Sequence, residues 1–174
     1  VQWQNDFLRS EPRTFENLPG LSESDSRAIT MTTEGRVRVG VDGAAKHAAD
    51  YRLRRAGAGA FFGPGHAYNM ARPLNGPTQT AQRAEVVAIR YGICEAAFAK
   101  LHSYTDSSYC HNMLDHIKSG GNVDGDQAHA DLWRDIKTAV NLREPDFFHT
   151  ELVPAHRKED AIDDDLISLE AHHY

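Results

Sequence analysis

The order of apolar and polar residues divides the chain into a polar first stretch and a patterned remainder. Residues 1–34 mix Pro, Gly, Ser and acidic residues without a clear period, and we interpret them as an N-terminal extension or linker. Alternation begins at Val37, Val39 and Val41, and it predicts a strand that ends at Asp42-Gly43. Residues 35–174 are expected to form one domain.

Two more strands are predicted next, in RRAGAGAFFGPGH (54–66) and AYNMARPLNGP (67–77), where glycine and proline mark the turns. From residue 82 the period becomes helical. The stretch 82–101 places Val86, Ile89, Ile93 and Ala96 on one face of a helix, with Glu85 at the edge of that face.

The second half of the domain alternates between strand and helix patterns. Strands are predicted in 101–108 and 147–156, and helices in 108–120, 131–140 and 160–174. Three antiparallel strands followed by alternating helices and strands indicate an α/β domain with a mixed sheet.

Composition restricts the class of protein only slightly. The chain has 174 residues, 40% hydrophobic and 25% charged, with no apolar run long enough to span a bilayer and no signal-peptide pattern. Because the first residue is Val, we expect a processed form or an excised domain. Cys94 and Cys110 are interpreted as reduced thiols of an intracellular protein, with nucleus, mitochondrion and cytoplasm all open.

The net charge of −6 argues weakly against a nucleic-acid partner, although a cluster of metal-binding carboxylates would bias that total. Three acids occupy comparable places: Asp42 ends a strand, Glu85 lies in the first turns of a helix, and Asp106 ends the fourth strand. Taken singly, they read as a turn residue, an exposed helix acid and a helix N-cap. If the first and fourth strands are neighbours, the three converge, and oxygen ligands of this kind suit Mg²⁺ or Mn²⁺.

An ordered set of motifs then gives a family resemblance. The stretches VDGAA, RAGAGAFFGPGH, QTAQRAEVVAI, YTDSSY, DLW and VPAH together resemble ribonuclease H of the cellular type I kind, and the second and third are closest to eukaryotic members. The resemblance implies a ribonuclease-H-like fold, a five-stranded mixed sheet with three antiparallel and two parallel strands, flanked by helices. It also implies hydrolysis of the RNA strand of RNA–DNA hybrids by a two-metal-ion mechanism with Mg²⁺, for which Mn²⁺ can substitute.

The resemblance assigns the metal ligands and catalytic residues by position. Asp42, Glu85 and Asp106 match three carboxylate ligands. The family's Asp-x-Leu opening its last helix selects Asp164 as the fourth, with Asp163 and Asp165 as neighbours in the same acidic run. His156 matches a loop histidine that assists water positioning or product release, although the loop after it is shorter than usual and lacks the family's glycines and asparagine.

Substrate contacts are expected at Gly43, Thr80 and Gln82, in the stretches that the resemblance assigns to the hybrid. This chain also departs from the family there. Ala81 replaces a minor-groove asparagine, Thr78 replaces a basic residue, and the usual Lys- and Trp-rich protrusion reads SGGNVDGDQAHA.

Three functions follow as alternatives. The chain is an active hybrid-specific endoribonuclease, a catalytically weak or silent scaffold domain in a larger assembly, or the ribonuclease H domain of a retroelement polyprotein. In the last two, neighbouring domains of a larger polypeptide are the partners. We expect no zinc site at Cys110, His111 and His116, because a second ligand pair at a recognised spacing is missing.

Overall fold

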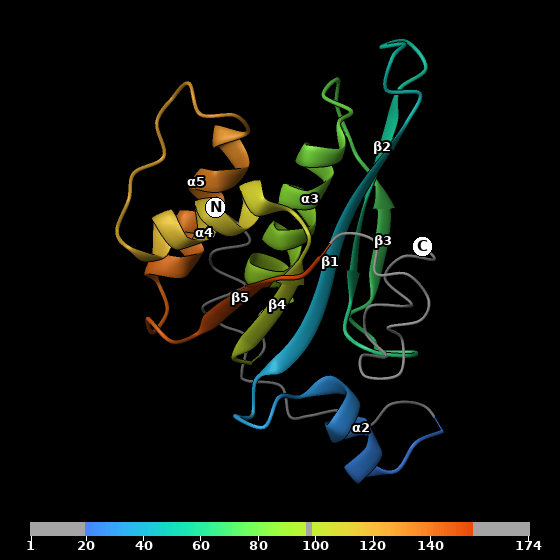
Figure 1. Cartoon of the computed structure of the whole chain (residues 1–174), viewed down its shortest axis with the longest axis vertical. Helices are drawn as coiled ribbons and strands as arrows, with labels where there is room; N and C mark the ends of the chain where they lie inside the picture. The colour runs from blue at the N-terminus through green and yellow to red at the C-terminus, as the bar shows by residue number, and fades with distance from the viewer. Residues whose placement is uncertain (1–19, 97–98, 155–174) are drawn as a thin grey trace.

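A five-stranded mixed sheet forms the centre of the domain in this computed structural model, which describes residues 20–96 and 99–154. Its spatial order is β3-β2-β1-β4-β5 (Figure 1). Strands β1, β2 and β3 pair antiparallel, whereas β1–β4 and β4–β5 pair parallel. The predicted sheet is therefore confirmed, with these strand bounds: β1 Val37–Lys46, β2 Arg55–Phe61, β3 Met70–Pro73, β4 Leu101–Thr105 and β5 Phe148–Leu152.

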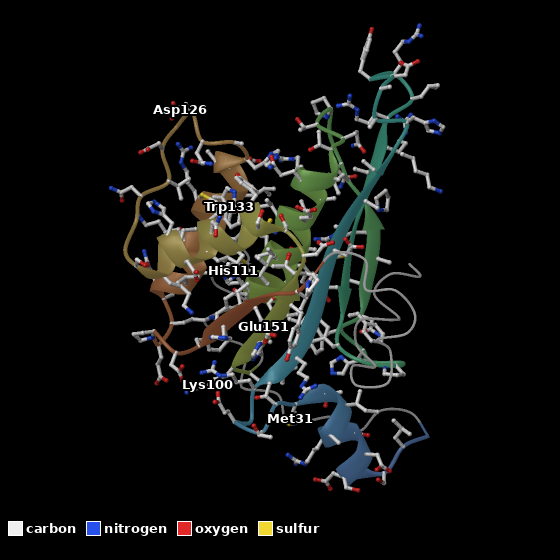
Figure 2. The ribbon with its side chains drawn as sticks, viewed as in Figure 1. Met31, Lys100, His111, Asp126, Trp133 and Glu151 are labelled. Carbon is white, nitrogen blue, oxygen red and sulfur yellow. The ribbon has the colours of Figure 1, made fainter. Side chains whose placement is uncertain are left out.

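Helices α3 (Ala81–Arg90), α4 (Ser108–Lys118) and α5 (Ala130–Asn141) lie together on one side of the sheet (Figure 1). Helix α3 packs on β1 and β2, α4 packs on β4 and β5, and α5 packs on both helices. We call the side that they cover the covered face. Its core includes Val37, Val39 and Val41 from β1 and the fully buried Trp133 of α5 (Figure 2).

Alternate residues of the same strands point to the other side, which we call the outer face. On β1 these are Arg38, Gly40, Asp42, Ala44 and Lys46, with Gly59, Gly57 and Arg55 of β2 opposite the last three. The two-residue repeat of a strand thus separates an apolar side from a side that carries charge.

The structure corrects the predicted end of β1. The strand continues past Asp42-Gly43 to Lys46, because its antiparallel ladder with β2 continues to the pair Lys46–Arg55. Its parallel pairing with β4 stops earlier, at Gly40–Tyr104. Asp42 therefore lies just beyond the end of the pairing with β4, at a point where β1 is still paired with β2.

Two further differences concern helices. Helix α3 ends at Arg90, and a π-helical turn, η1 (Tyr91–Glu95), replaces the rest of the long helix predicted from residue 82. The predicted apolar face is nevertheless confirmed, since Val86, Ile89, Ile93 and Ala96 are all buried. None of the described helices has the length and apolarity needed to cross a membrane.

Residues 23–30, predicted to be irregular, form helix α2 (Glu23–Thr30). Ser22 caps this helix by accepting a hydrogen bond from the Asp25 amide, and the buried hydroxyl of Thr30 donates to the carbonyl of Ser26. Because its buried residues are polar, the helix has no apolar period for sequence reasoning to detect. The predicted helix 160–174 lies outside the described residues.

Candidate metal and active site

Gly43 determines how closely helix α3 approaches the sheet. A Cβ atom at this position would overlap the backbone nitrogen of Glu85 and lie 2.7 Å from the carbonyl oxygen of Ala81. Only a residue without a side chain permits that contact. Gly43 thereby brings the second turn of α3, and with it Glu85, against the strand that carries Asp42.

Asp42 and Asp106 come from neighbouring parallel strands. The last pair of the β1–β4 ladder is Gly40–Tyr104, and each aspartate lies two residues beyond its member of that pair. Both side chains are half-buried, and one oxygen of Asp42 accepts a hydrogen bond from the Gly43 amide at 2.7 Å. Neighbouring ends of parallel strands are a common place for sites in α/β sheets.

Asp106 does not cap helix α4. Ser107 takes that role, because its hydroxyl oxygen accepts a hydrogen bond from the Cys110 amide at 3.3 Å, and its own amide donates to the Thr105 hydroxyl at 3.1 Å. The simplest structural explanation for Asp106, that of a helix N-cap, is therefore wrong. Among the described residues, the cap of this helix is therefore Ser107 and not the Asp106 carboxylate.

The surroundings of Glu85 shift the pKa of its carboxyl. Burial raises the pKa of its carboxyl, hydrogen bonding from Ser107 opposes that rise, and the negative charges of Asp106 and Asp42 add to it. The thiol of Cys110 also lies 3.9 Å from Glu85 Oε2. Asp42 and Asp106 are thus close enough for their negative charges to act on the Glu85 carboxyl.

Within residues 20–96 and 99–154, none of these three acids forms an ion pair. In the same described ranges, no group of three or more His, Cys, Asp or Glu side chains is arranged as a metal cage. In the described part of the chain, the site is thus a group of three neighbouring acids without an ion-pair partner, close to where the β1–β4 ladder ends.

The predicted substrate residues Thr80 and Gln82 lie at the start of α3. The Thr80 hydroxyl oxygen accepts a hydrogen bond from the Arg83 amide at 3.2 Å and so caps the helix. The exposed Gln82 pairs through Oε1 with Nε2 of His129 at 3.2 Å. His129 adopts a left-handed conformation, with φ of 59°, immediately before α5.

An ion pair fixes this region to α5. Arg83 donates two hydrogen bonds to Asp131, at 3.1 and 2.6 Å, and the Arg83 side chain lowers the pKa of the Asp131 carboxyl. Arg83 is therefore already engaged by a carboxylate. Two of the side chains predicted to contact substrate lie here, and both have donors that the hydrogen bonds described above do not use: the hydroxyl hydrogen of Thr80 and the amide NH₂ of Gln82.

The segment where the family carries its basic protrusion is acidic. Asp124 and Asp126 lie in the exposed loop between α4 and α5, and Figure 2 shows Asp126 at its outer end. The loop is held at its base by Tyr109, whose hydroxyl donates to the Ala128 carbonyl at 2.8 Å and accepts from Trp133 Nε1 at 2.9 Å. The loop is thus anchored to the core, and it carries negative charge.

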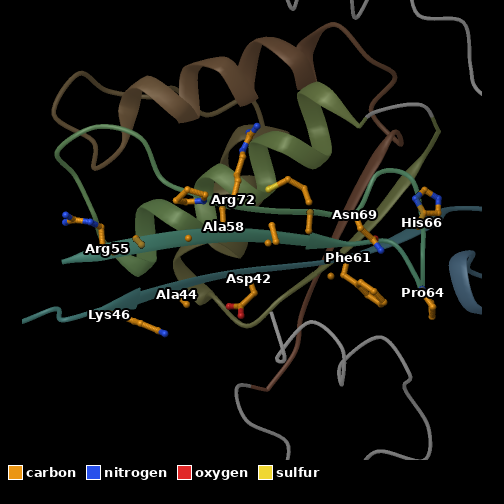
Figure 3. Close-up of a pocket in the computed structure, with 18 of the residues that line it drawn as sticks. Asp42, Ala44, Lys46, Arg55, Ala58, Phe61, Pro64, His66, Asn69 and Arg72 are labelled. Atoms are coloured by element: carbon orange, nitrogen blue, oxygen red, sulfur yellow. The ribbon is translucent and has the colours of Figure 1, made fainter. Parts of the chain in front are cut away.

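A groove of about 890 Å³ runs along the outer face from this site (Figure 3). Asp42 lies between its two ends, with Lys46 and Arg55 towards one end and His66 towards the other. The floor is made by small residues, among them Ala44, Gly57 and Gly59. Between Asp42 and Lys46, the facing residues of β1 and β2 contribute no long side chain to this floor.

Sequence reasoning missed three residues of this region. Ser107 and Cys110 contact Glu85, and His129 contacts Gln82. The role of Ser107 could have been predicted, because Ser is a preferred N-cap and this one lies at the start of a predicted helix. The other two contacts depend on helix packing, which local pattern does not reveal. His156 and Asp164 lie outside the described residues, so their predicted roles stay predictions.

Comparison with known structures agrees with this fold. The solution structure of the PFV RNase H domain superposes with a TM-score of 0.59 at 20% sequence identity, covering 78% of this chain and 89% of that domain. The native Prototype Foamy Virus protease-reverse transcriptase gives 0.56 at 19% identity over 78% of this chain. This chain corresponds to only 19% of that longer protein.

The third comparison is the foamy viral protease-reverse transcriptase in complex with RNA/DNA hybrid, with a TM-score of 0.54 at 16% identity; the match covers 94% of this chain and 22% of that one. Among curated proteins, the search found no match. The fold and its acidic site define a ribonuclease-H-like domain. The RNase H family model matches residues 34–167, and the chain belongs to the RNase H family.

Proposed function

We propose that this domain is an endoribonuclease that hydrolyses the RNA strand of RNA–DNA hybrids, with Asp42, Glu85, Asp106 and Asp164 holding two divalent metal ions. The observation that supports the proposal is the acid cluster, in which burial, and after it the negative charges of Asp106 and Asp42, raise the pKa of Glu85. Clustered carboxylates repel one another, and a divalent cation removes that repulsion.

The donor set suits Mg²⁺ or Mn²⁺. All of the proposed ligands are carboxylates, and hard cations of this kind prefer oxygen. Mg²⁺ usually keeps several waters and binds through one or two carboxylates together with substrate phosphates. An arrangement without a closed cage, as in the described part of this chain, is compatible with a site that a phosphate completes.

When bound, such ions would activate a water and stabilise the charge on the leaving oxygen. The residues of the chain would perform the positioning. The Gly43 backbone keeps α3 close to β1, and we propose that Glu85 and Asp42 would thereby face the same phosphate. Thr80 and Gln82 would donate hydrogen bonds to the duplex, and His156 would assist water positioning or product release.

The hybrid is the proposed substrate because of family membership and because the structure of a foamy viral protein with this fold is known in complex with RNA/DNA hybrid. That protein is several times longer than the matched region, which favours neighbouring domains as partners here as well. A retroelement polyprotein is therefore one proposed origin of the domain.

One observation favours the second candidate function, a weak or silent scaffold domain. The α4–α5 loop carries Asp124 and Asp126, and negative charge near a nucleic acid weakens binding. This candidate predicts an intact fold with no cleavage under any metal condition.

A cleavage assay separates the two candidates. An RNA–DNA hybrid labelled on its RNA strand is incubated with the domain in Mg²⁺, in Mn²⁺ and in EDTA, beside single-stranded RNA and duplex RNA. The proposal predicts internal cuts in the RNA of the hybrid, dependent on a divalent ion, and little cleavage of the other substrates. A hybrid left intact in both metals would favour the scaffold.

A further inference from the structure

The turn between β1 and β2 concentrates positive charge in an acidic protein. Residues 46–55 read KHAADYRLRR, so four basic residues stand against Asp50 alone, a formal charge of +3 with His47 neutral, whereas the whole chain has −6. Figure 1 shows this turn projecting beyond the helices at the top of the view. The asymmetry indicates an anionic ligand for this end of the molecule.

Lys46 and Arg55 form the most informative pair of this hairpin end. They are direct partners in the antiparallel ladder, and both side chains are exposed. Like charges placed opposite each other destabilise a strand pair. In the described part of the chain neither side chain forms an ion pair. Arg55 donates a hydrogen bond to the Arg54 carbonyl at 2.7 Å, and Asp50, the acid of this hairpin, forms its ion pair with Arg52. A bound anion would turn this unfavourable pair into a favourable one.

The pair also lies in line with the acid cluster. Asp42, Ala44 and Lys46 are alternate residues of β1 on the outer face, and Figure 3 shows them pointing to the same side. At about 3.4 Å per residue, Lys46 lies roughly 14 Å beyond Asp42. One strand of a duplex carries a phosphate about every 3.4 Å of its axis, so a duplex whose axis is parallel to β1 would span roughly four nucleotides over this distance.

The floor between the two positions is suited to close approach of a polymer backbone. Ala44, Gly57 and Gly59 line it, and no long side chain projects there from the facing pairs of β1 and β2. Beyond Lys46, Tyr51 is 82% exposed. Exposed aromatic rings beside basic side chains are typical of surfaces that contact nucleic acids.

We propose that the hairpin end formed by Lys46 and Arg55 binds the phosphate backbone of a nucleic-acid duplex, a few nucleotides away from the acid cluster. The inference rests on the proposed function, because it takes the duplex held at Asp42 as the ligand. In this proposal the hairpin supplies affinity for the duplex, which the acidic α4–α5 loop, being negatively charged, does not supply. The acid cluster then cleaves a duplex whose backbone is bound at the hairpin.

The test is duplex binding by the whole chain in EDTA, where no cleavage occurs. Fluorescence anisotropy with a labelled RNA–DNA hybrid compares the wild type with Lys46→Gln/Arg55→Gln. The control is Arg27→Gln/Lys100→Gln, which changes the net charge equally and removes exposed cations at the opposite end of the molecule (Figures 1 and 2). Those two cations are in surface ion pairs, whose loss costs little stability.

The hairpin variant should bind on the order of ten-fold more weakly, and its dependence of log Kd on log salt should be shallower by about 0.9 for each lost contact. The control should bind like the wild type. Equal affinity of both variants would overturn the inference. So would failure of the wild type to bind any duplex at low salt, an outcome that would favour an acidic protein as the ligand.

Unfolding and failure of the proposed function are both recognisable. Removing the like-charge pair should leave Tm unchanged or slightly higher, so a loss of binding at constant Tm reports the lost contacts. If the wild type cleaves hybrid but the hairpin variant binds normally, only this inference fails. If the variant loses affinity but the wild type never cleaves, the proposed activity fails and the binding surface stands.

Discussion

The covered and outer faces of one sheet are built from alternate residues of the same strands, yet they have different properties. On β1 the covered face contributes Val37, Val39 and Val41, which are at most 6% exposed, whereas the outer face contributes Asp42 and Lys46. The first set excludes water and stabilises the fold. The second is positioned by that fold and contributes charge.

Neighbouring residues of β1 can thus serve different purposes, one the packing of the fold and the next the chemistry of the site. Gly43 belongs to the covered face and is required by packing, while Asp42, next to it, is required by no described packing contact or ion pair. Covered-face substitutions should therefore change stability first, and outer-face substitutions should change activity or binding first.

The largest expected effect is on activity. Asp106→Asn, or Asp42→Asn, should reduce cleavage of the hybrid by more than about 100-fold, because the loss of a metal ligand exceeds the 10–100-fold typical of groups one step further from a metal. The melting temperature should stay equal or rise, since one repelling charge is removed. Kinetics and thermal unfolding on the same preparations provide the measurement.

The matched control is Glu151→Gln, another acid of the outer face, on β5. Its carboxylate pairs with His102 at 3.0 Å and is not part of the acid cluster. Cleavage by this variant should equal that of the wild type. Equal losses at Glu151 and Asp106 would show that general negative charge, and not a metal site, supports the activity.

Next in size is the effect of Gly43→Ala on the fold. Its methyl group would overlap the backbone of α3, so we expect a loss of about 1–3 kcal/mol in the free energy of unfolding, together with reduced cleavage. Gly57→Ala is the comparison, because a Cβ there would lie at an ordinary 3.5 Å from the Arg72 carbonyl. Denaturant unfolding should find Gly57→Ala within about 0.5 kcal/mol of the wild type. If the two variants are equally stable, close packing of α3 does not depend on Gly43.

Much of the fold could be predicted from the sequence, because the buried apolar residues recur with the two-residue period of a strand or the 3.6-residue period of a helix. The alternation at Val37 and the helical spacing of Val86 and Ile89 placed β1 and α3 correctly. The end of β1 at Lys46 could not be predicted, since it is fixed by pairing with residues of β2. Helix α2 was missed because its buried residues, Ser26 and Thr30, are polar.

The site was partly predictable for the same reason. Asp42 and Asp106 were expected to be neighbours if their strands paired, and the parallel β1–β4 ladder confirms that pairing. That Ser107, and not Asp106, caps α4 was beyond local pattern, because both residue types are good caps. The assignments of His156 and Asp164 still rest on the family resemblance alone.

A smaller effect is expected from Ser107→Ala. Loss of the helix cap should cost about 1 kcal/mol. The variant also removes a hydrogen bond that opposes the rise in the Glu85 pKa, so the pKa should rise further and divalent-ion binding near neutral pH should weaken. Ser108→Ala, at the adjacent exposed position, should change neither stability nor metal affinity by a measurable amount. The same result for both serines would contradict the capping assignment.

The smallest effect concerns pH and stability. Because the pKa of Glu85 is higher in the folded protein than in the unfolded chain, the folded state holds its proton more tightly. Stability should therefore fall as pH rises from the ordinary Glu range near 4.5 through the raised pKa. Glu85→Gln should flatten this part of the profile, as measured by urea unfolding across pH. An unchanged slope would show that Glu85 is not the titrating group.

The most direct test of the metal site is the position at which Mn²⁺ binds, read from paramagnetic loss of backbone amide signals in NMR spectra. At substoichiometric Mn²⁺, the signals of Gly43, Glu85 and Ser107 should disappear first, and Asp42→Asn/Asp106→Asn should abolish that selectivity. The outer face offers a built-in comparison in His102, His149 and Glu151, where the two rings lie 4.7 Å apart. Loss of these signals first, or unchanged broadening in the double variant, would contradict the account.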